Sequence, residues 1–263
     1  MKRCTYLLTA LLLCAVLTVP ARAARRSVPV QADGSLVTAA AYVDQGVTYV
    51  PLRTLLNALG NWDVWWDSGS GQAAAASKGA SLRADPAGNT VTVSGRKLTG
   101  RVTVENGVTY VPLRLVCEAL GCRVKWDPYL GGAAVTSPGA AYDAGELYWL
   151  SRIIYAESGG ESITGQIAVG NVILNRVKSS QFPDTVEGVI FDRKDAVQFE
   201  PVGNGRIYQT PSAQSVEAAK RALDGENVIG SALYFYAPAL SQGTWINANC
   251  TYQRTIGCHR FYI

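Results

Sequence analysis

The sequence predicts an α+β fold with two unlike domains. The first half is expected to consist of duplicated strand-helix-strand units, and the second half to be mainly helical with a closing hairpin. An eight-residue segment that occurs twice and long stretches of helical apolar spacing carry this prediction. Of the 263 residues, 48% are hydrophobic and 17% are charged. This composition excludes disorder throughout, and the length favours more than one compact unit.

Residues 1–23 have the pattern of a secretory signal peptide. Lys2 and Arg3 precede an apolar run over 5–19, and the small residues of Ala21-Arg22-Ala23 fit a cut after Ala23. The alternative is a retained membrane anchor, but a spanning helix needs about 20 apolar residues and this run is shorter. We therefore expect an exported protein.

Loss of the signal peptide also removes most of the net charge. Lys2, Arg3 and Arg22 leave with no acid, so the formal charge falls from +4 to +1. The rest of the sequence has no cluster of Lys and Arg of the kind that binds a phosphate backbone. We expect no nucleic acid partner and no stable membrane insertion after cleavage.

The mature chain keeps four cysteines, an even number that in an exported protein indicates two disulfides. Short separation in sequence favours the pairs Cys117–Cys122 and Cys250–Cys258. No metal or other cofactor is expected, because His259 is the only histidine and the cysteines lack paired C-x-x-C spacing.

An internal repeat organises the first half. Residues 46–53, Gly-Val-Thr-Tyr-Val-Pro-Leu-Arg, recur letter for letter at 107–114. Each copy continues into an apolar helix, a closing glycine and a strand that ends in Trp-Asp. The proline stands where strand gives way to helix, because its fixed φ suits the first helical turn. The helices are 52–59 and 113–120, closed by Gly60 and Gly121, and the strands end at Asp67 and Asp127.

The Tyr-Val-Pro-Leu-Arg motif, followed by Ala-Leu-Gly and Trp-Asp, resembles the copper amine oxidase-like N-terminal domain, a module common in exported bacterial proteins. The resemblance covers residues 28–138. It implies no copper, because this segment contains no histidine to bind the metal. Residues 69–80 depart from the Thr-Val-x-Val strand of the family, which predicts a loosened first copy.

Six aromatic side chains in the repeats leave two interpretations open. They form either a glycan-stacking surface, since sugar faces pack well on aromatic rings, or the core of a plain spacer or stalk. The six are Tyr49, Tyr110, Trp62, Trp65, Trp66 and Trp126.

Residues 131–145, rich in Gly, Ser, Pro and Ala, break the repeat pattern and predict a linker. We place the repeat domain at 28–138, the linker between the domains at 139–145 and the second domain at 146–263.

The first helix of the second half places a carboxylate in an apolar stripe. With Asp143 as N-cap, Leu147, Leu150, Ile154 and Glu157 fall three and four residues apart. The helix must end at the following Ser-Gly-Gly, so Glu157 also lies near the negative end of the helix dipole. Burial and dipole both raise the pKa of Glu157, as a general acid for glycosidic cleavage requires. The plainer interpretation is a solvated glutamate at a helix end.

Further elements follow in order. Residues 163–178 are apolar almost all round and predict a buried central helix, whose Asn175 and Arg176 either cap carbonyls and pair with an acid or orient substrate. Short helices are expected between Pro183 and Phe191 and over 212–223. Residues 192–210 are expected to be irregular, residues 233–236 to form a strand, and residues 245–262 a closing hairpin.

A series of motifs runs through this half. They occupy 150–161, 165–177, 182–183, 196–199, 204–207, 232–236 and 256–262. Together they resemble the SleB-type cell wall hydrolases, the spore cortex-lytic enzymes and their relatives, in the order of that family. The match covers residues 145–263.

This resemblance implies a lysozyme-like or lytic-transglycosylase-like domain that cleaves peptidoglycan between N-acetylmuramic acid and N-acetylglucosamine. The first glutamate of the A-E-x-x-G-E pattern, Glu157, is then the catalytic acid. In transglycosylase chemistry Glu157 protonates the leaving oxygen and then, as a carboxylate, takes the proton of the muramoyl C6 hydroxyl while that hydroxyl attacks the anomeric carbon. Because this nucleophile is intramolecular, a second carboxylate is not obligatory.

Hydrolysis would instead use a second carboxylate. Glu161 is the nearest in sequence, although its plainer role is to begin the next helix, where acids favour the dipole. Glu200, Asp184 and Asp195 lie in or near loops and are further candidates.

Substrate-binding candidates come from the predicted loop 192–210, since long ordered loops concentrate binding residues. Gln198 offers an amide for acetamido groups, and Phe199 and Tyr208 offer rings for sugar faces. Tyr234 and Tyr236 are further candidates, with strand core as the alternative. His259 is expected to make a structural hydrogen bond, with a catalytic role as the alternative.

Two functions remain open. The first is an exported enzyme that degrades peptidoglycan, a lytic transglycosylase or muramidase in spore germination or wall remodelling, secreted or associated with the wall or spore envelope. The second is a wall-binding or structural protein whose hydrolase-like domain is inactive. Glu157 with its flanking Gly-Gly-Glu favours the enzyme.

Overall fold

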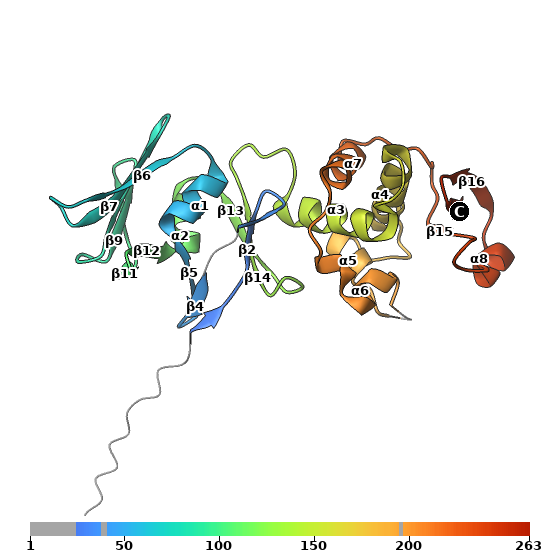
Figure 1. Ribbon diagram of the computed structural model, residues 1–263, viewed down its shortest axis with the longest axis horizontal. Coiled ribbons are helices and arrows are strands. Elements are labelled where there is room, and N and C mark those ends of the chain that lie inside the picture. The colour runs from blue at the N-terminus through green and yellow to red at the C-terminus, as the bar shows by residue number, and fades with distance from the viewer. Residues whose placement is uncertain (1–24, 38–40, 195–196) are drawn as a thin grey trace, which may run out of the picture.

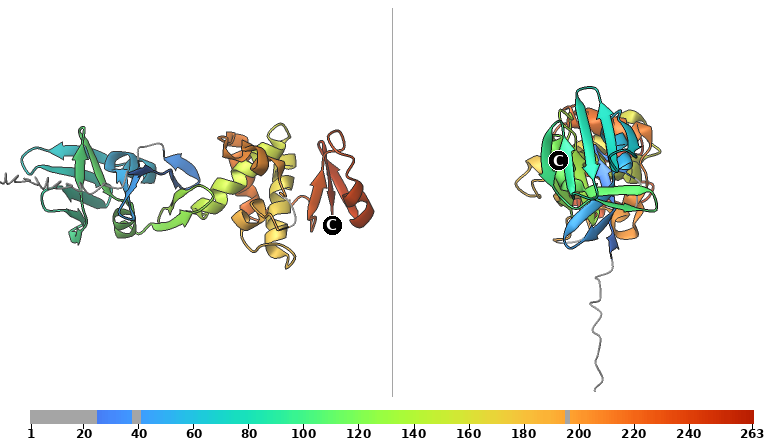
Figure 2. Two further views of the ribbon diagram at one scale, coloured as in Figure 1. Left: turned by 90° about the horizontal axis from the view of Figure 1, so that it is seen from below. Right: turned by 90° about the vertical axis from the view of Figure 1, so that its left-hand side faces the viewer.

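The structure is a computed structural model that describes residues 25–37, 41–194 and 197–263. The expected signal peptide and Asp195 lie outside these residues. A β-rich N-terminal part, a group of helices and a small C-terminal sheet follow one another along the long axis of the molecule (Figures 1 and 2). This arrangement is the α+β fold that the sequence predicts.

The two copies of the repeat pair with each other. Strands β5 (Val47–Pro51) and β12 (Val108–Pro112) are antiparallel neighbours, with Val50 opposite Val111. Because the paired segments are identical, the ladder relates the two copies by a local twofold axis. Their sheet has the order β1-β4-β5-β12-β11. Its outer strands are β1 (Arg26–Ser27), β4 (Tyr42–Asp44) and β11 (Thr103–Glu105).

Each copy forms the predicted strand-helix-strand unit. Helices α1 (Leu52–Leu59) and α2 (Leu113–Ala119) begin directly after the proline and bury their leucines against the central sheet. Strands β6 (Asp63–Asp67) and β13 (Arg123–Asp127) follow.

The two copies then enter different sheets. The first joins β10-β9-β8-β7-β6, and the second joins β13-β14-β2-β3. The second sheet is completed by the N-terminal strand β2, which runs parallel to β14. A Cβ at Gly132 would collide with the carbonyl oxygen of Pro29, so glycine lets the two segments meet. The strands not yet bounded are β7 (Gln72–Ser77), β8 (Ala80–Asp85), β9 (Thr90–Val93), β10 (Arg96–Thr99), β14 (Gly132–Thr136), β2 (Val30–Ala32) and β3 (Ser35–Val37).

Two expectations for this half are wrong. Residues 69–80 do not loosen the first copy, because the alanines of β7 are small enough to be covered by the fold and pair in full register with β6 and β8. Residues 131–145 are not a continuous linker, because β14 is a wholly buried strand. Only a short connection remains before the first helix of the second half.

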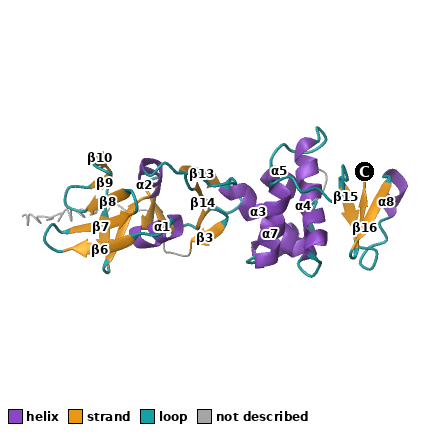
Figure 3. Cartoon of the chain, turned by 90° about the horizontal axis from the view of Figure 1, so that it is seen from above, coloured by secondary structure: helices purple, strands orange, loops and turns teal. Residues whose placement is uncertain are grey.

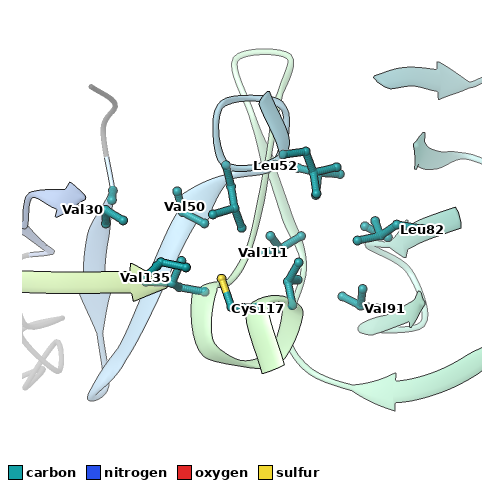
Figure 4. Close-up of a cluster of buried hydrophobic side chains, with 14 of the residues drawn as sticks. Val30, Val50, Leu52, Leu82, Val91, Val111, Cys117 and Val135 are labelled. Carbon is teal, nitrogen blue, oxygen red and sulfur yellow. The ribbon is translucent and has the colours of Figure 1, made fainter. Parts of the chain in front are cut away.

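A single apolar core joins the helices and sheets of the N-terminal part. Figure 4 shows side chains from several strands and from both repeat helices converging on it. The labelled members are Val30, Val50, Leu52, Leu82, Val91, Val111, Cys117 and Val135.

Three long helices build the second half: α3 (Ala144–Ser158), α4 (Ile163–Lys178) and α7 (Ala213–Leu223), which pack on one another (Figure 3). Asp143 caps α3 as predicted, since its Oδ1 accepts a 3.0 Å hydrogen bond from the Gly145 amide. Most residues of α4 are buried, as expected for a central helix.

The smaller elements differ from expectation in two places. The segment 192–210 contains α6 (Glu200–Asn204) and a 3₁₀ turn, η1 (Arg206–Tyr208), separated by Gly205 at φ 81°. It is therefore more ordered than predicted, because Pro201 starts a helical turn and a left-handed glycine ends it. Helix α5 (Val186–Ile190) precedes this segment.

The chain ends in a sheet of order β15-β17-β16, where β15 is Tyr234–Tyr236, β16 is Tyr252–Ile256 and β17 is His259–Tyr262. The predicted hairpin is correct for β16 and β17, but its first residues form a helix, α8 (Thr244–Asn249). Across the described part of the chain, no helix is both long and apolar enough to span a membrane.

Candidate active site

Glu157 lies in the last turn of α3, half-buried, on the face that carries the buried Leu150 and Ile154. The helix ends directly afterwards. The Ser158 hydroxyl donates to the Ile154 carbonyl at 2.8 Å, and the Gly159 amide donates to that of Tyr155 at 2.9 Å. The backbone at Glu157 is therefore fixed at a helix end, and burial limits the water around the carboxyl group.

This environment raises the pKa of Glu157 to about 7. Burial is the main cause, because it penalises the charged form, and the negative charge of Glu200 adds to the effect. The Arg206 guanidinium acts in the opposite direction and lowers the pKa. A large share of the Glu157 side chains is therefore protonated at neutral pH.

The turn between α6 and η1 brings Glu200 and Arg206 to Glu157. Arg206 donates through Nη2 to the Ala156 carbonyl at 3.0 Å, which ties the turn to the end of α3. Asn204 accepts from the Arg206 amide at 3.0 Å and donates to Glu200 at 3.4 Å. The sequence indicated Glu200 only as a possible second carboxylate and did not identify Arg206, although both lie in or beside motif segments.

Glu161, the other possible second carboxylate, faces the C-terminal sheet. Its carboxylate accepts from the Cys258 amide at 3.2 Å, and Oε1 lies 3.9 Å from Nδ1 of His259. Its backbone carbonyl accepts from Gln166 and Gln214. These contacts make Glu161 a tether between the start of α4 and the hairpin β16–β17.

His259 is buried, and this burial lowers its pKa. Its Nδ1 has no hydrogen-bond partner among the described residues, and the ring lies edge-on to Phe235 at 5.3 Å. Nδ1 thus makes no hydrogen bond to Glu161, which stands too far away to accept one.

The three substrate-binding candidates from segment 192–210 differ in how far their side chains are exposed to solvent. Phe199 is 3% exposed and lies beneath Arg176 at 5.3 Å, so its ring is core and does not face a substrate. Gln198 is half-buried beside it. Tyr208 is 54% exposed, meets Trp149 edge-on at 5.8 Å and remains available to a sugar face.

Tyr236 belongs to the core of the C-terminal sheet, where its hydroxyl donates to Asn247 and the ring packs on Tyr262. Tyr234 instead lies half-buried between Phe182 and the exposed Trp245. Of the two tyrosine candidates, only Tyr234 borders solvent.

Asn175 and Arg176 fasten α4 to the approach of β15. Asn175 donates to the carbonyls of Gly230 and Ala232, and Arg176 donates through Nε to that of Leu233 at 2.8 Å. Among the described residues Arg176 makes no ion pair with an acid, and burial lowers its pKa to about 10. Both side chains therefore bond carbonyls, one of the alternatives that the sequence left open.

The four described cysteines are free thiols. Cys117 and Cys122 are hydrogen-bonded to each other, which raises the pKa of Cys117 and lowers that of Cys122. The pairing of Cys250 with Cys258 is wrong, because the extended strand β16 separates the two residues. A strand advances about 3.3 Å per residue, whereas bridged Cα atoms lie about 4.4–6.8 Å apart.

The N-terminal part contacts the first turns of α3 through a hydrogen bond and an ion pair. Asp127 accepts a 2.7 Å hydrogen bond from the Trp149 indole, and Lys125 binds Asp143 at 2.8 Å. A Cβ at Gly34 would press on the Leu147 side chain. The helix that carries Glu157 is thus held against the N-terminal part by specific side-chain contacts.

Within the ranges that the structure describes, no group of three His, Cys, Asp or Glu side chains is placed to hold a metal ion.

Two families of known proteins match separate parts of the chain. Residues 160–262 match the family described as Cell Wall Hydrolase, beginning just beyond Glu157, and residues 31–132 match the Copper amine oxidase N-terminal domain.

Three curated relatives illustrate the similarity of the second half. A spore cortex-lytic enzyme of Bacillus cereus is 40% identical over 105 residues, 40% of this chain and 39% of the relative. That of Bacillus subtilis is 35% identical over 128 residues, 49% of this chain and 40% of the relative. The cell wall hydrolase CwlJ of Halalkalibacterium halodurans is 33% identical over 95 residues, 34% of this chain and 65% of the relative.

The chain thus spans about two fifths of the length of the cortex-lytic relatives. Among solved structures, the catalytic domain of the germination-specific lytic transglycosylase SleB from Bacillus anthracis is 37% identical, with a TM-score of 0.43. The match covers 48% of this chain and 99% of that domain.

Proposed function

We propose that the protein is an exported enzyme that cleaves peptidoglycan. The proposal rests on its domains, because the chain joins a copper amine oxidase N-terminal domain to a SleB-like cell wall hydrolase domain. The bond cleaved is the one between N-acetylmuramic acid and N-acetylglucosamine. Its substrate is the glycan strand of spore cortex or of vegetative wall, and its place of action is the wall or spore envelope. The expected signal peptide supports export.

One observation carries this proposal: a half-buried glutamate at the end of α3 whose pKa is about 7. Glycosidic cleavage needs an acid that is protonated at working pH and strong enough to give up its proton. Glu157 meets both requirements, because burial and Glu200 keep it protonated while Arg206 limits the rise of its pKa.

Transglycosylase chemistry follows from the use of this single acid. Glu157 donates its proton to the glycosidic oxygen as the bond to the anomeric carbon breaks. The resulting carboxylate takes the proton of the muramoyl C6 hydroxyl, whose oxygen closes onto the anomeric carbon as a 1,6-anhydro ring. The proton taken from the C6 hydroxyl replaces the one that Glu157 donated, so Glu157 ends the cycle protonated, as it began.

The position of the other carboxylates favours this route over hydrolysis. Glu161 is engaged with Cys258 and lies against the C-terminal sheet. Glu200 is exposed and bonded to Asn204, and its charge acts on the pKa of Glu157. An internal nucleophile removes the need for either of them to activate water.

The decisive variant is Glu157→Gln, with Glu146→Gln as the matched control. Glu146 lies in the first turn of the same helix, and burial raises its pKa too. We expect Glu157→Gln to abolish release of soluble fragments from purified sacculi and Glu146→Gln to retain it. Full activity of Glu157→Gln contradicts the proposal.

Mass spectrometry of the released fragments tests the reaction type. Anhydromuramic ends indicate a transglycosylase, and reducing muramic ends indicate a muramidase. Parallel digestion of cortex and vegetative sacculi identifies the preferred wall.

A further inference from the structure

A groove on the N-terminal domain has no part in the proposed catalysis. We name it the Trp66 groove. It lies between the first turn of α1 and β6 from one repeat copy and the β11–β12 hairpin from the other. Its volume is 420 Å³, within the range of about 300–1,000 Å³ typical of small-molecule sites.

The Trp66 groove gathers exposed apolar side chains. Trp65, Trp66, Val104 and Val108 all line it, and their exposed fractions are 46%, 47%, 43% and 39%. Single exposed apolar residues are ordinary, but several that share one groove mark an interaction site. Among them, the Trp66 indole offers a flat face on which a sugar ring stacks.

The local twofold axis generates a second groove of 610 Å³ around Trp126. Trp126 occupies the position of Trp66 in the repeat and is 46% exposed. A tryptophan that served the core would be covered in at least one copy. Equal exposure at equivalent positions shows that neither ring belongs to the core.

The two grooves differ in what their charged residues bind. In the Trp126 groove, Arg114 donates to Glu118 at 3.2 Å and to a backbone carbonyl at 3.0 Å. Lys125 stands where the first copy has Trp65, and it binds Asp143 at the start of α3. In the second copy, Arg114 and Lys125 are therefore both engaged in contacts within the chain.

In the Trp66 groove the cation remains available. Arg53, the equivalent of Arg114, is exposed and has no hydrogen-bond or ion-pair partner among the described residues. A free guanidinium beside the exposed Trp66 indole fits a ligand that combines sugar faces with carboxylates.

We propose that the Trp66 groove binds a glycan strand of peptidoglycan, with a sugar face on the Trp66 ring and Arg53 paired with a lactyl or stem-peptide carboxylate. The choice of polymer rests on the proposed function. The catalytic domain then acts on a strand that the N-terminal domain holds elsewhere along its length.

The test measures sedimentation of the mature Glu157→Gln chain with purified sacculi. Hydrofluoric acid is first used to remove from the sacculi all polymers that are linked through phosphodiesters. Trp66→Ala and Arg53→Gln are each expected to weaken binding about tenfold, while Trp66→Phe keeps a ring and retains most of the affinity. Leu36→Ala and Arg96→Gln, both exposed in the same domain but outside the groove, are the matched controls and are expected to bind normally.

Unchanged binding by Trp66→Ala and Arg53→Gln overturns the proposal. So does a loss of binding on stripping the sacculi, which assigns the ligand to a phosphodiester-linked polymer, or a dimer that Trp66→Ala dissociates. Arg53 is exposed and its replacement leaves the fold intact, so the test does not depend on Trp66 alone. Fragment release by the unmutated chain is measured separately. An active chain whose groove variants bind normally contradicts only the binding proposal, whereas an inactive chain contradicts the proposed function.

Discussion

Asp127 in the second repeat copy binds Trp149, eight residues before Glu157 on the same helix, through a 2.7 Å hydrogen bond. Its other carboxylate oxygen holds the turn after β13 by accepting from the amides of Tyr129 and Leu130. Asp67 holds the same turn in the first copy, but its second oxygen binds the exposed Arg83. One position of the repeat thus connects the N-terminal domain to α3 in one copy only.

Asp127→Ala should destabilise the protein more than Asp67→Ala. Both changes remove the turn contacts, but only the first leaves the buried Trp149 indole without an acceptor. That unpaired donor costs about 1–3 kcal/mol. Urea unfolding of the two variants measures the difference, and equal losses would show that the contact contributes nothing.

Activity should fall as pH rises through about 7, because the proton donor Glu157 ionises there. Glu200→Gln removes a negative charge that raises the pKa of Glu157, so the alkaline limb should move to lower pH. Arg206→Gln removes the charge that lowers it, so that limb should move to higher pH. Profiles of fragment release against pH test the fall near pH 7 and both shifts, and coincident profiles argue against the coupling.

The same carboxyl group should make stability depend on pH. Its folded pKa of about 7 lies above the usual value of 4.5, so folding favours the protonated form. This contribution is fully present below pH 4.5 and is lost as pH rises through about 7. It amounts to about 3 kcal/mol at most. Glu157→Gln should flatten that part of the stability curve, as measured by unfolding at several pH values.

Glu161 should behave as a structural residue. Glu161→Gln keeps an oxygen for the Cys258 amide and should retain fragment release, whereas Glu161→Ala should lose about 1–2 kcal/mol of stability. A Gln variant that folds normally but is inactive would assign catalysis to this carboxylate.

Oxidation should join Cys117 to Cys122 and leave Cys250 and Cys258 as thiols. The first two are already in contact, while β16 separates the others. The bridge should stabilise the oxidised protein by roughly 2 kcal/mol. Peptide mapping after mild oxidation identifies the pair, and a linked Cys250–Cys258 peptide would contradict the fold of the C-terminal sheet.

Local signals predicted the elements well. Pro51 and Pro112 locate the start of each repeat helix, and Asp143 caps α3 as expected, because turns and caps depend on neighbouring residues. The direction of the pKa shift of Glu157 also followed from its helix face.

Long-range pairing was harder to predict. Residues 132–136 have the composition of a linker, but they pair with β13 on one side and with the distant β2 on the other and form a buried strand. Arg206 reaches α3 because Gly205 turns left-handed, and Phe199 is core because Arg176 covers it. Hydrophobic spacing does not encode such contacts between segments far apart in sequence.

The ladder between β5 and β12 opposes two identical segments, so the same hydrogen bonds can form between two chains as within one. Exchange of this strand would produce a domain-swapped dimer without changing a contact. What favours the closed monomer is the chain that connects the two copies, which keeps the effective concentration of each strand near its partner high. The length of that connection, including β7 and β8, therefore decides whether the repeat folds on itself or on a neighbour.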